Sequence, residues 1–512
     1  MIVDDQRDVL AFLADPAAYG AGVRSVERID THSAVVFLAG GRAYKLKRAV
    51  RYDYLDFSTV ERRRAACEAE VALNRRTAPQ IYLGTAVVTR GPDGRLAIDG
   101  RGAPIDWLVV MVRFDEETLF DRLAARGALD LALMAPLAAA IAAFHAAAAR
   151  VPDHGGRAGM AWVIDGNADG FAEQGRGVLE RGACERVTAR SRAELDARAA
   201  LLEARRHAGF VRRCHGDLHL RNLCLVDGRP TLFDAVEFND EIACVDVFYD
   251  LAFLLMDLWR RGLRAHASLV CNEYLQATQD FDALPLLPLF LACRAAVRAK
   301  TSATAARLQA DPARAPALHQ SAREYLAMAE SLLRPAPPRL VAIGGLSGSG
   351  KSTLARAIAP DLGRPPGGLI VRSDVVRKSL CGVPPLTTLD QSAYAPEVTR
   401  RVYDTLAERA VQGLRAGQAV IADAVYGSPA ERAAIEAVAR TAGVPFTGLW
   451  LEAPPAVLAA RIRGRSFDAS DATTDVLASQ MARDVGPVSW HRVEASADAA
   501  AVARAAATAL GS

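Results

Sequence analysis

The loop from Gly345 to Ser352, GLSGSGKS, constrains the fold of this chain more than any other stretch of its sequence. It matches the pattern G-x-x-x-x-G-K-[ST], in which glycines let the backbone turn so tightly that its N–H groups converge on phosphate oxygens. An apolar run, Leu340 to Ile343, precedes the loop, and a helical pattern follows it from Thr353. A helix that starts there directs its positive N-terminal end at the same anion. The motif therefore predicts a strand, a phosphate-binding loop and a helix.

The residues of this loop have distinct predicted roles toward ATP and Mg²⁺. Lys351 would reach the β- and γ-phosphates, and the hydroxyl of Ser352 would bind Mg²⁺. The predicted nucleotide contacts are Gly345, Ser347, Gly348, Ser349, Gly350, Lys351, Ser352 and Thr353.

Three later apolar runs, at residues 368–371, 418–422 and 447–451, are each followed by a helical pattern. Such alternation predicts a parallel sheet that is covered by helices on both faces. Residues that follow the strands of such a sheet face the ligand crevice. We therefore expect polar residues at these positions to take part in chemistry.

Two aspartates follow these predicted strands. Asp374 could accept the proton of an acceptor hydroxyl, with Arg377 holding the acceptor, although an aspartate before a helical stretch is also a common N-cap. Asp423 ends the run at 418–422 and would orient Mg²⁺, with a capping or loop aspartate as the alternative.

Three arginines follow the last of the three runs. Arg461, Arg463 and Arg465 fit a lid that closes over transferring phosphates, and we favour Arg461 and Arg465 as nucleotide contacts. The alternative is a solvated basic face.

Residues 339–512 resemble the small-molecule P-loop kinases, which include gluconate kinase, chloramphenicol phosphotransferase and the zeta toxins. The resemblance rests on the phosphate loop, on SDVVRK at residues 373–378, and on Asp423. It implies that Asp374 is the catalytic base. Because acceptor pockets vary widely in that family, it implies no particular substrate.

The stretch Arg334 to Arg339, RPAPPR, predicts a stiff extended linker. We therefore expect a first domain at residues 1–333, a linker at 334–338 and a P-loop domain at 339–512. Two short strands at residues 33–38 and 42–47 surround a Gly-Gly turn. A charged helix follows at 57–77, with Ser58 or Thr59 as its N-cap. This order predicts a β-rich N-lobe of about residues 1–113 and a helical C-lobe of about residues 114–333.

The sequence HGDLHLRN, His215 to Asn222, has the spacing that protein kinases use in their catalytic loop. In that chemistry Asp217 would receive the acceptor proton, and Asn222 and Asp234 would bind Mg²⁺. A lysine on an upstream strand would hold the ATP phosphates and pair with a glutamate on the next helix. We favour Lys45 with Glu68 for this pair, but Lys47 and Glu70 remain alternatives.

Residues 1–333 resemble the aminoglycoside phosphotransferase-like kinases, which also include choline and sugar kinases. HGDLHLRN, Tyr249-Asp250 and Phe144-His145 carry this resemblance. The glycine-rich G-x-G-x-x-G loop of protein kinases is missing, and Asp30 to Ser33 stands in its place. The whole chain resembles bacterial proteins that fuse such a domain to a P-loop kinase domain. This implies a bilobal α+β kinase fold followed by an α/β P-loop fold.

The overall composition narrows the class of protein. A formal charge of +3 over 512 residues gives no support for nucleic-acid or membrane-surface binding. The 8 cysteines are scattered without C-x-x-C pairs, which favours free thiols in a reducing compartment such as the cytoplasm. The alanine-rich run 131–149 is interpreted as a buried soluble helix.

The sequence therefore predicts an ATP- and Mg²⁺-dependent phosphotransferase, with two active sites, acting on small-molecule hydroxyl groups. Two alternatives stay open: a regulatory role for the first domain, and a toxin or antibiotic-modifying kinase. Acidic residues after Asp234 would suit a cationic or amino-sugar acceptor, but a solvated acidic loop explains them as well. They are Glu237, Asp240, Glu241 and Asp246. The oligomeric state is open.

Overall fold

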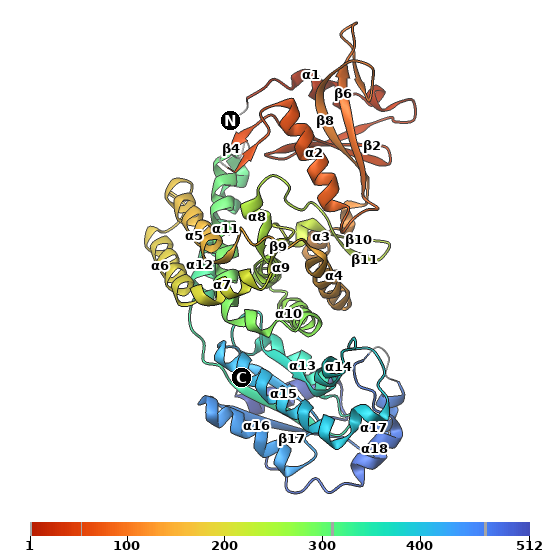
Figure 1. Cartoon of the computed structure of the whole chain (residues 1–512), viewed down its shortest axis with the longest axis vertical. Helices are drawn as coiled ribbons and strands as arrows, with labels where there is room; N and C mark the ends of the chain where they lie inside the picture. The colour runs from red at the N-terminus through yellow and green to blue at the C-terminus, as the bar shows by residue number, and fades with distance from the viewer. Residues whose placement is uncertain (1–2, 53, 309–311, 465–467, 512) are drawn as a thin grey trace. The chain divides into compact units, whose positions relative to one another are not determined.

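The computed structural model describes residues 3–52, 54–308, 312–464 and 468–511. Contacts group the chain into two compact units, one formed by residues 1–162 and 199–254 and the other by 163–198 and 255–512. The second unit thus contains helices on both sides of the proline stretch, and the predicted domain division at 334–338 stays a prediction. Figure 1 labels the elements, and each unit is described by itself.

A six-stranded antiparallel sheet with the order β1-β2-β3-β8-β6-β7 forms the N-terminal part of the first unit. Its strands are β1 (Val26–Asp30), β2 (Ala34–Ala39), β3 (Arg42–Lys47), β6 (Tyr82–Arg90), β7 (Leu96–Ile98) and β8 (Ala103–Val112). The predicted hairpin is confirmed as β2 and β3. A short pair, β4 (Arg51–Tyr52) and β5 (Leu55–Asp56), follows it.

The two faces of this sheet pack on different helices. Tyr44 and Leu46 of β3 face helix α1 (Arg7–Ala14), whereas Ala43 faces α2 (Val60–Asn74). Because side chains alternate along a strand, Lys45 and Lys47 lie on the α2 side with Ala43. The N-cap of α2 is Thr59, one of the two predicted caps.

The rest of the first unit is mainly helical and carries two small antiparallel strand pairs. Its helices include α3 (Phe120–Ala125), α4 (Met134–Ala147), α7 (Ala199–His207), α8 (Asp240–Ala243) and the first part of α9 (Val247–Arg260). The strand pairs are β9 (Val211–Arg213) with β12 (Cys244–Asp246), and β10 (Leu223–Val226) with β11 (Arg229–Leu232). The predicted alanine-rich helix is confirmed as α4, whose apolar side chains are buried.

The second unit begins with a group of helices: the greater part of α5 (Gly156–Glu173), α6 (Arg181–Ala197), α10 (Arg264–Thr278), α11 (Leu287–Leu308) and α12 (Ala315–Leu332). Helices α11 and α12 pack along each other, and α6 packs against both. Among the described helices, none combines the length and the apolar character needed to cross a membrane.

The second unit continues with a five-stranded parallel sheet in the order β14-β15-β13-β16-β17, which confirms the predicted α/β fold. Its strands are β13 (Leu340–Gly345), β14 (Leu369–Arg372), β15 (Val420–Asp423), β16 (Phe446–Glu452) and β17 (His491–Glu494). Helices α13 (Lys351–Ile358) and α19 (Ala499–Leu510) share one core with the sheet.

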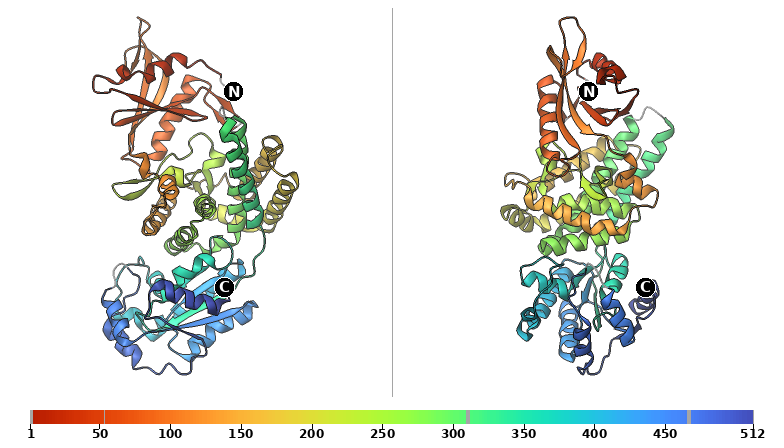
Figure 2. Two further views of the ribbon diagram at one scale, coloured as in Figure 1. Left: turned by 180° about the vertical axis from the view of Figure 1, so that it is seen from behind. Right: turned by 90° about the vertical axis from the view of Figure 1, so that its right-hand side faces the viewer.

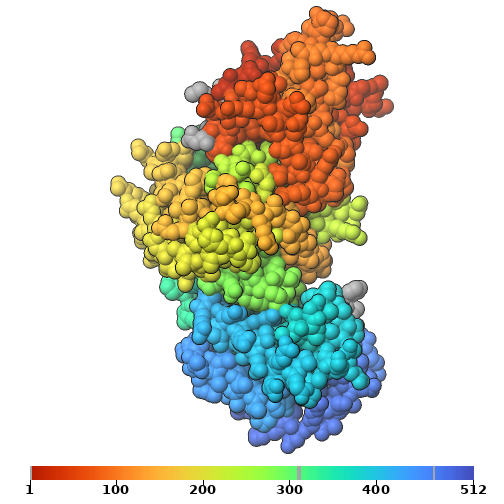
Figure 3. All heavy atoms as spheres, in the orientation of Figure 1, coloured from red at the N-terminus to blue at the C-terminus, as the bar shows by residue number. Residues whose placement is uncertain are grey.

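Helices α15 (Pro396–Arg415) and α16 (Pro429–Ala442) pack on the sheet as well, and Figure 2 shows helices on both of its faces. In the space-filling view of Figure 3 these two helices cover the side of the sheet turned to the viewer. The remaining helices are α14 (Ser373–Leu380), α17 (Pro455–Arg463) and α18 (Thr474–Met481).

Candidate active sites

The phosphate loop has the backbone that its glycines predict. Gly348 and Gly350 adopt φ angles of 84° and 92°, in the left-handed region. A Cβ at Gly348 would come within 2.6 Å of the carbonyl oxygen of Leu458, so a larger residue would not fit there. Lys351 folds over the loop, where its Nζ donates to the carbonyl oxygens of Gly345 and Leu346 at 2.9 and 3.1 Å.

Neighbouring strand ends bring Ser352 and Asp423 together. Parallel pairing sets Ile343 opposite Asp423, so the helix after β13 starts beside the end of β15. The Ser352 hydroxyl donates to Asp423 Oδ2 at 2.6 Å. Arg372, at the end of β14, lies 3.5 Å from the same carboxylate and 2.9 Å from Asp468. No motif marks Asp468, which lies beyond α17, and for this reason the sequence did not reveal it.

Asp374 lies in the first turn of α14, next to this group. The N-cap position of α14 is Arg372, so the alternative of a capping role for Asp374 is wrong. Burial and the nearby charge of Asp423 raise the pKa of Asp374, and Arg372 opposes them. A carboxylate with a raised pKa is a stronger base than an exposed aspartate, as proton acceptance from a hydroxyl requires.

Arg377 is buried and supports the chain near Tyr394. Its Nη1 donates to Ala393 O at 2.6 Å and to Thr399 Oγ1 at 3.3 Å, and its guanidinium lies 4.6 Å from the centroid of the Tyr394 ring. The predicted acceptor contact of Arg377 stays a prediction, and the geometry adds a structural role.

The lid arginines differ in their positions. A Cβ built on Gly350 would lie 3.9 Å from Arg461 Nη1, so Arg461 stands beside the phosphate loop. Its Nη2 donates to Ala497 O at 3.3 Å. Arg463 is exposed, and Arg465 lies outside the described residues. A lid function stays a prediction for all of them.

In the first unit, Lys45 joins two of the predicted partners. Its Nζ lies 2.9 Å from Glu70 Oε1 and 2.6 Å from Asp234 Oδ1. The partner of Lys45 is therefore Glu70, and the prediction of Glu68 is wrong. Side chains two positions apart on a helix point in directions that differ by about 200°, so only one of the two glutamates can face the sheet. Glu68 instead pairs with Arg64 at 2.8 Å on the exposed face of α2.

The loop at residues 215–222 holds Asp217 and Asn222 together. Asn222 Nδ2 donates to Asp217 Oδ2 at 3.0 Å and to its carbonyl oxygen at 2.9 Å. His219 Nε2 lies 3.3 Å from the same carboxylate. The side chain of Asp217 is 40% exposed, which leaves it accessible to an acceptor.

Asp234 has an unusual backbone for a residue other than glycine, with φ of 61°. Its N–H donates to the Tyr82 hydroxyl at 3.1 Å, and the N–H of Ala235 donates to Asn74 Oδ1 at 2.8 Å. Left-handed conformations of this kind persist where the surroundings hold them, and they concentrate at functional sites. The carboxylate is 41% exposed and lies against Lys45.

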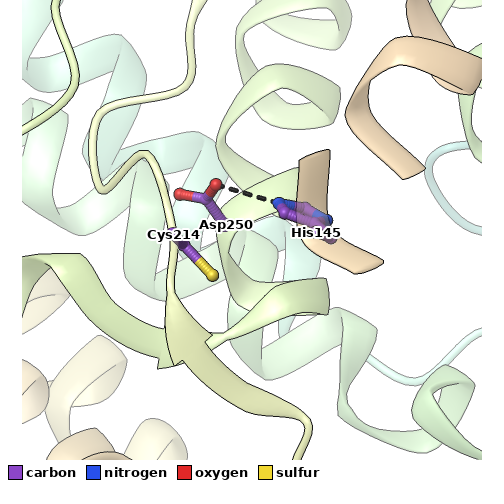
Figure 4. A group of neighbouring side chains, drawn as sticks. All are labelled: His145, Cys214 and Asp250. Atoms are coloured by element: carbon purple, nitrogen blue, oxygen red, sulfur yellow. Dashed lines mark hydrogen bonds and ion pairs between the residues drawn. The ribbon is translucent and has the colours of Figure 1, made fainter. Parts of the chain in front are cut away.

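Figure 4 shows Asp250, which holds the loop around Asp217 in place. Its carboxylate accepts the N–H groups of His215 and Gly216 at 3.1 and 2.8 Å, and His145 Nε2 lies 3.1 Å away. Together with Cys214, these side chains place potential metal-ligating atoms within 4.8 Å of one another. Because the Asp250 carboxylate accepts hydrogen bonds from two backbone N–H groups, we assign it to positioning of the loop and not to metal binding.

Each of the acidic residues after Asp234 has a basic or imidazole partner. Glu237 pairs with Lys47, Asp240 with Arg213 at 2.6 Å, Glu241 with His154 at 3.0 Å, and Asp246 with Arg205 at 2.7 Å. Glu237 and Asp246 are buried, whereas Asp240 and Glu241 are about half exposed, so a rim for a cationic acceptor is reduced to two residues and stays a prediction.

Two family models match the chain. Residues 39–287 match the phosphotransferase enzyme family, and residues 340–486 match an AAA domain. Among solved structures, a choline/ethanolamine kinase family protein from Mesorhizobium loti is 15% identical, with a TM-score of 0.39, over 64% of this chain and 98% of that one. A gluconokinase from Sinorhizobium meliloti is 22% identical, with a TM-score of 0.25, over 35% of this chain and 94% of its own.

Among curated proteins, uncharacterized proteins of Mycobacterium tuberculosis and Mycobacterium bovis are each 32% identical over 479 residues, covering 91% of both chains. The predicted fusion of an aminoglycoside phosphotransferase-like domain with a P-loop kinase-type domain is confirmed, and the chain belongs to the same family as these mycobacterial proteins.

Proposed function

We propose that this chain transfers the γ-phosphoryl group of ATP to hydroxyl groups of small molecules at two separate active sites. One observation carries the proposal: each unit contains its own lysine, its own carboxylate that is either accessible or has a raised pKa, and its own oxygen ligands for a metal. The family matches support phosphotransfer in general, and the two sites give it a mechanism.

At the P-loop site, Lys351 and the loop N–H groups would hold the β- and γ-phosphates. Oxygens of Ser352 and Asp423, which already share a hydrogen bond of 2.6 Å, fit the preference of Mg²⁺ for hard oxygen ligands. Bound Mg²⁺ would neutralise charge on the phosphates. Asp374 would take the proton of the acceptor hydroxyl as that oxygen attacks the γ-phosphorus, while the bond from this phosphorus to the β–γ bridging oxygen breaks and ADP leaves.

At the first site, Lys45 would hold the ATP phosphates, and Asn222 and Asp234 would supply the oxygen ligands for Mg²⁺. Asp217 would accept the proton of the second acceptor. The acceptors we propose are small molecules such as sugars or amino sugars, and we propose neither nucleic-acid nor membrane binding.

A second candidate function follows from one sequence difference. Asp30 to Ser33 replaces the glycine-rich loop that covers the nucleotide in protein kinases, which would weaken the grip of the first site on ATP. In this candidate the first site senses a nucleotide or metabolite and only the P-loop site performs chemistry.

The test is incubation of the protein with ATP, Mg²⁺ and fractionated metabolite extracts, followed by ³¹P NMR for new phosphoesters. We expect two products. Asp217→Asn removes one and Asp374→Asn the other, with rate losses of about 10²–10⁴-fold, because each variant removes a proton acceptor. Loss of products only with Asp374→Asn supports the sensing role, and no ATP-dependent product with the unaltered protein contradicts both candidates.

A further inference from the structure

A second buried lysine lies beside the phosphate-binding Lys45. Lys47 occupies the next inward position on β3, and its side chain is 3% exposed. It pairs with Glu70 from α2 and with Glu237, whose side chains are 0% and 5% exposed. A lysine this deeply buried is rare unless it is paired, and here it has two carboxylate partners.

The two lysines divide the carboxylate of Glu70 between them. Lys45 lies 2.9 Å from Oε1, and Lys47 contacts Oε2. Lys47 therefore fixes the rotation of the Glu70 carboxylate, and this rotation sets where Lys45 is held. Without Lys47, one oxygen of Glu70 would lose its partner and the carboxylate could turn.

Glu237 extends this network to the loop that carries Asp234. The two residues are three positions apart, and each contacts one of the two lysines. Strand β3, helix α2 and the loop at residues 234–237 are thus tied together by charges. The other side of Asp234 is held by the backbone contacts of Asp234 and Ala235 with Tyr82 and Asn74.

Aromatic side chains border Lys47, the more deeply buried of the two lysines. The Lys47 ammonium lies 5.2 Å from the centroid of the Phe57 ring, and Phe57 makes an edge contact with Phe238. Burial raises the pKa of Glu237, and the Lys47 charge opposes this. In surroundings of low polarity, ion pairs are screened little by water, so their geometry is held firmly.

We propose that Lys47 and Glu237 are positioning residues, which hold Glu70, Lys45 and the Asp234 loop in the geometry that binds the ATP phosphates. The inference rests on the proposed function of the first site. Neither residue touches the nucleotide; both act through Glu70 and through the loop.

The test measures ATP binding at the first site alone. Calorimetry with ATP and Mg²⁺ is carried out on the full chain carrying Lys351→Ala, which silences the phosphate loop. Adding Glu237→Gln should weaken ATP binding by about tenfold or more, because Lys47 then competes with Lys45 for Glu70 and the phosphate-binding ammonium moves. Thermal unfolding of each variant is recorded in parallel.

The matched control is Asp106→Asn, which breaks another buried ion pair of the same lobe. Arg63 lies 2.8 Å from Asp106, and both side chains are 1% exposed. We expect this variant to unfold at lower temperature while its affinity for ATP stays within about twofold of the background. If Glu237 has a positioning role, Glu237→Gln lowers the affinity for ATP. If its role is purely structural, the variant lowers only the unfolding temperature.

If Glu237→Gln does not fold, the double variant Lys47→Met with Glu237→Gln is used instead. It removes both charges of the Lys47–Glu237 pair, so the ammonium of Lys47 is not left buried without Glu237. It should show the same loss of affinity. Equal affinities in the Glu237 variants and the control overturn the inference but leave the proposed function standing. Absence of ATP binding in the Lys351→Ala background overturns both.

Discussion

At the level of single residues, the carboxylates around the phosphate loop differ in what holds them. Asp423 accepts from the Ser352 hydroxyl and lies beside Arg372. Asp374, which follows the neighbouring strand, has a pKa raised by burial. Sequence position predicted both residues, because the ends of parallel strands are recognisable. Their different surroundings depend on Arg372 and Asp468, which come together only in the folded chain.

The raised pKa of Asp374 leads to a prediction about stability. The folded protein holds this proton more tightly than the unfolded chain, so the ionised form destabilises the fold and stability improves as the pH falls. Asp374→Asn should therefore raise the unfolding temperature near neutral pH by a few degrees while it abolishes one activity. The difference from the unaltered protein should shrink as the pH is lowered from near neutral toward the ordinary pKa of an aspartate, about 3.9.

Calorimetric unfolding over this pH range checks the prediction. Asp468→Asn serves as the control, because it removes an ion pair of 2.9 Å with Arg372 and should lower the unfolding temperature. An unfolding temperature for Asp374→Asn at or below that of the unaltered protein near neutral pH would contradict this account.

At the level of elements, helix α2 illustrates which features can be predicted from the sequence and which cannot. The helix and its Thr59 cap follow from the pattern, but Glu68 and Glu70 are chemically alike. The buried residues Cys67 and Val71 distinguish the two glutamates, because they define the face of α2 that packs on the sheet. Glu70 lies beside this face and is buried as well. Strand β17 was missed for another reason: only Val493 of its residues is buried, so it lacks an apolar run.

The orientation of α2 gives a prediction with its own internal control. Glu70→Ala removes the partner of the buried Lys47 and the partly buried Lys45, and should lower ATP affinity at the first site by at least tenfold. Glu68→Ala breaks only an exposed pair with Arg64, which contributes at most about 0.5 kcal/mol, and should leave affinity unchanged. Calorimetry in the Lys351→Ala background compares them, and similar losses in both variants would refute the assignment of Glu70.

At the level of the whole molecule, the proline stretch suggests two independent domains, but the contacts of the second unit cross it. Asn272 of α10 is buried, and its side-chain amide lies against the edge strand β14. Its Oδ1 accepts the N–H of Ile370 at 2.7 Å, and its Nδ2 donates to Gly368 O at 3.2 Å. This contact could not be predicted from the sequence, because an asparagine on a helix does not reveal its distant partners.

Replacing Asn272 should therefore destabilise the P-loop sheet. Asn272→Leu leaves the N–H of Ile370 in β14 and the carbonyl group of Gly368 just before β14 without their side-chain partner, at a cost of about 2–4 kcal/mol. Glu273→Ala is the neighbouring control, since it removes only a contact of 3.1 Å with the half-exposed Arg356. Urea unfolding of both variants measures the difference, and equal midpoints would show that the amide contributes nothing.

The Asn272 amide also bears on how this chain could have been assembled and how it can be divided. Asn272 lies within the segment that matches the phosphotransferase family, whereas Gly368 and Ile370 lie within the AAA segment. If the gene were cut at the prolines, Ile370 N–H and Gly368 O would lose their partner at the edge of the sheet. Unpaired groups at a sheet edge can pair with strands of other chains. The two segments are therefore expected to be inherited and expressed together, because Asn272 of one segment satisfies hydrogen-bonding groups at the sheet edge of the other.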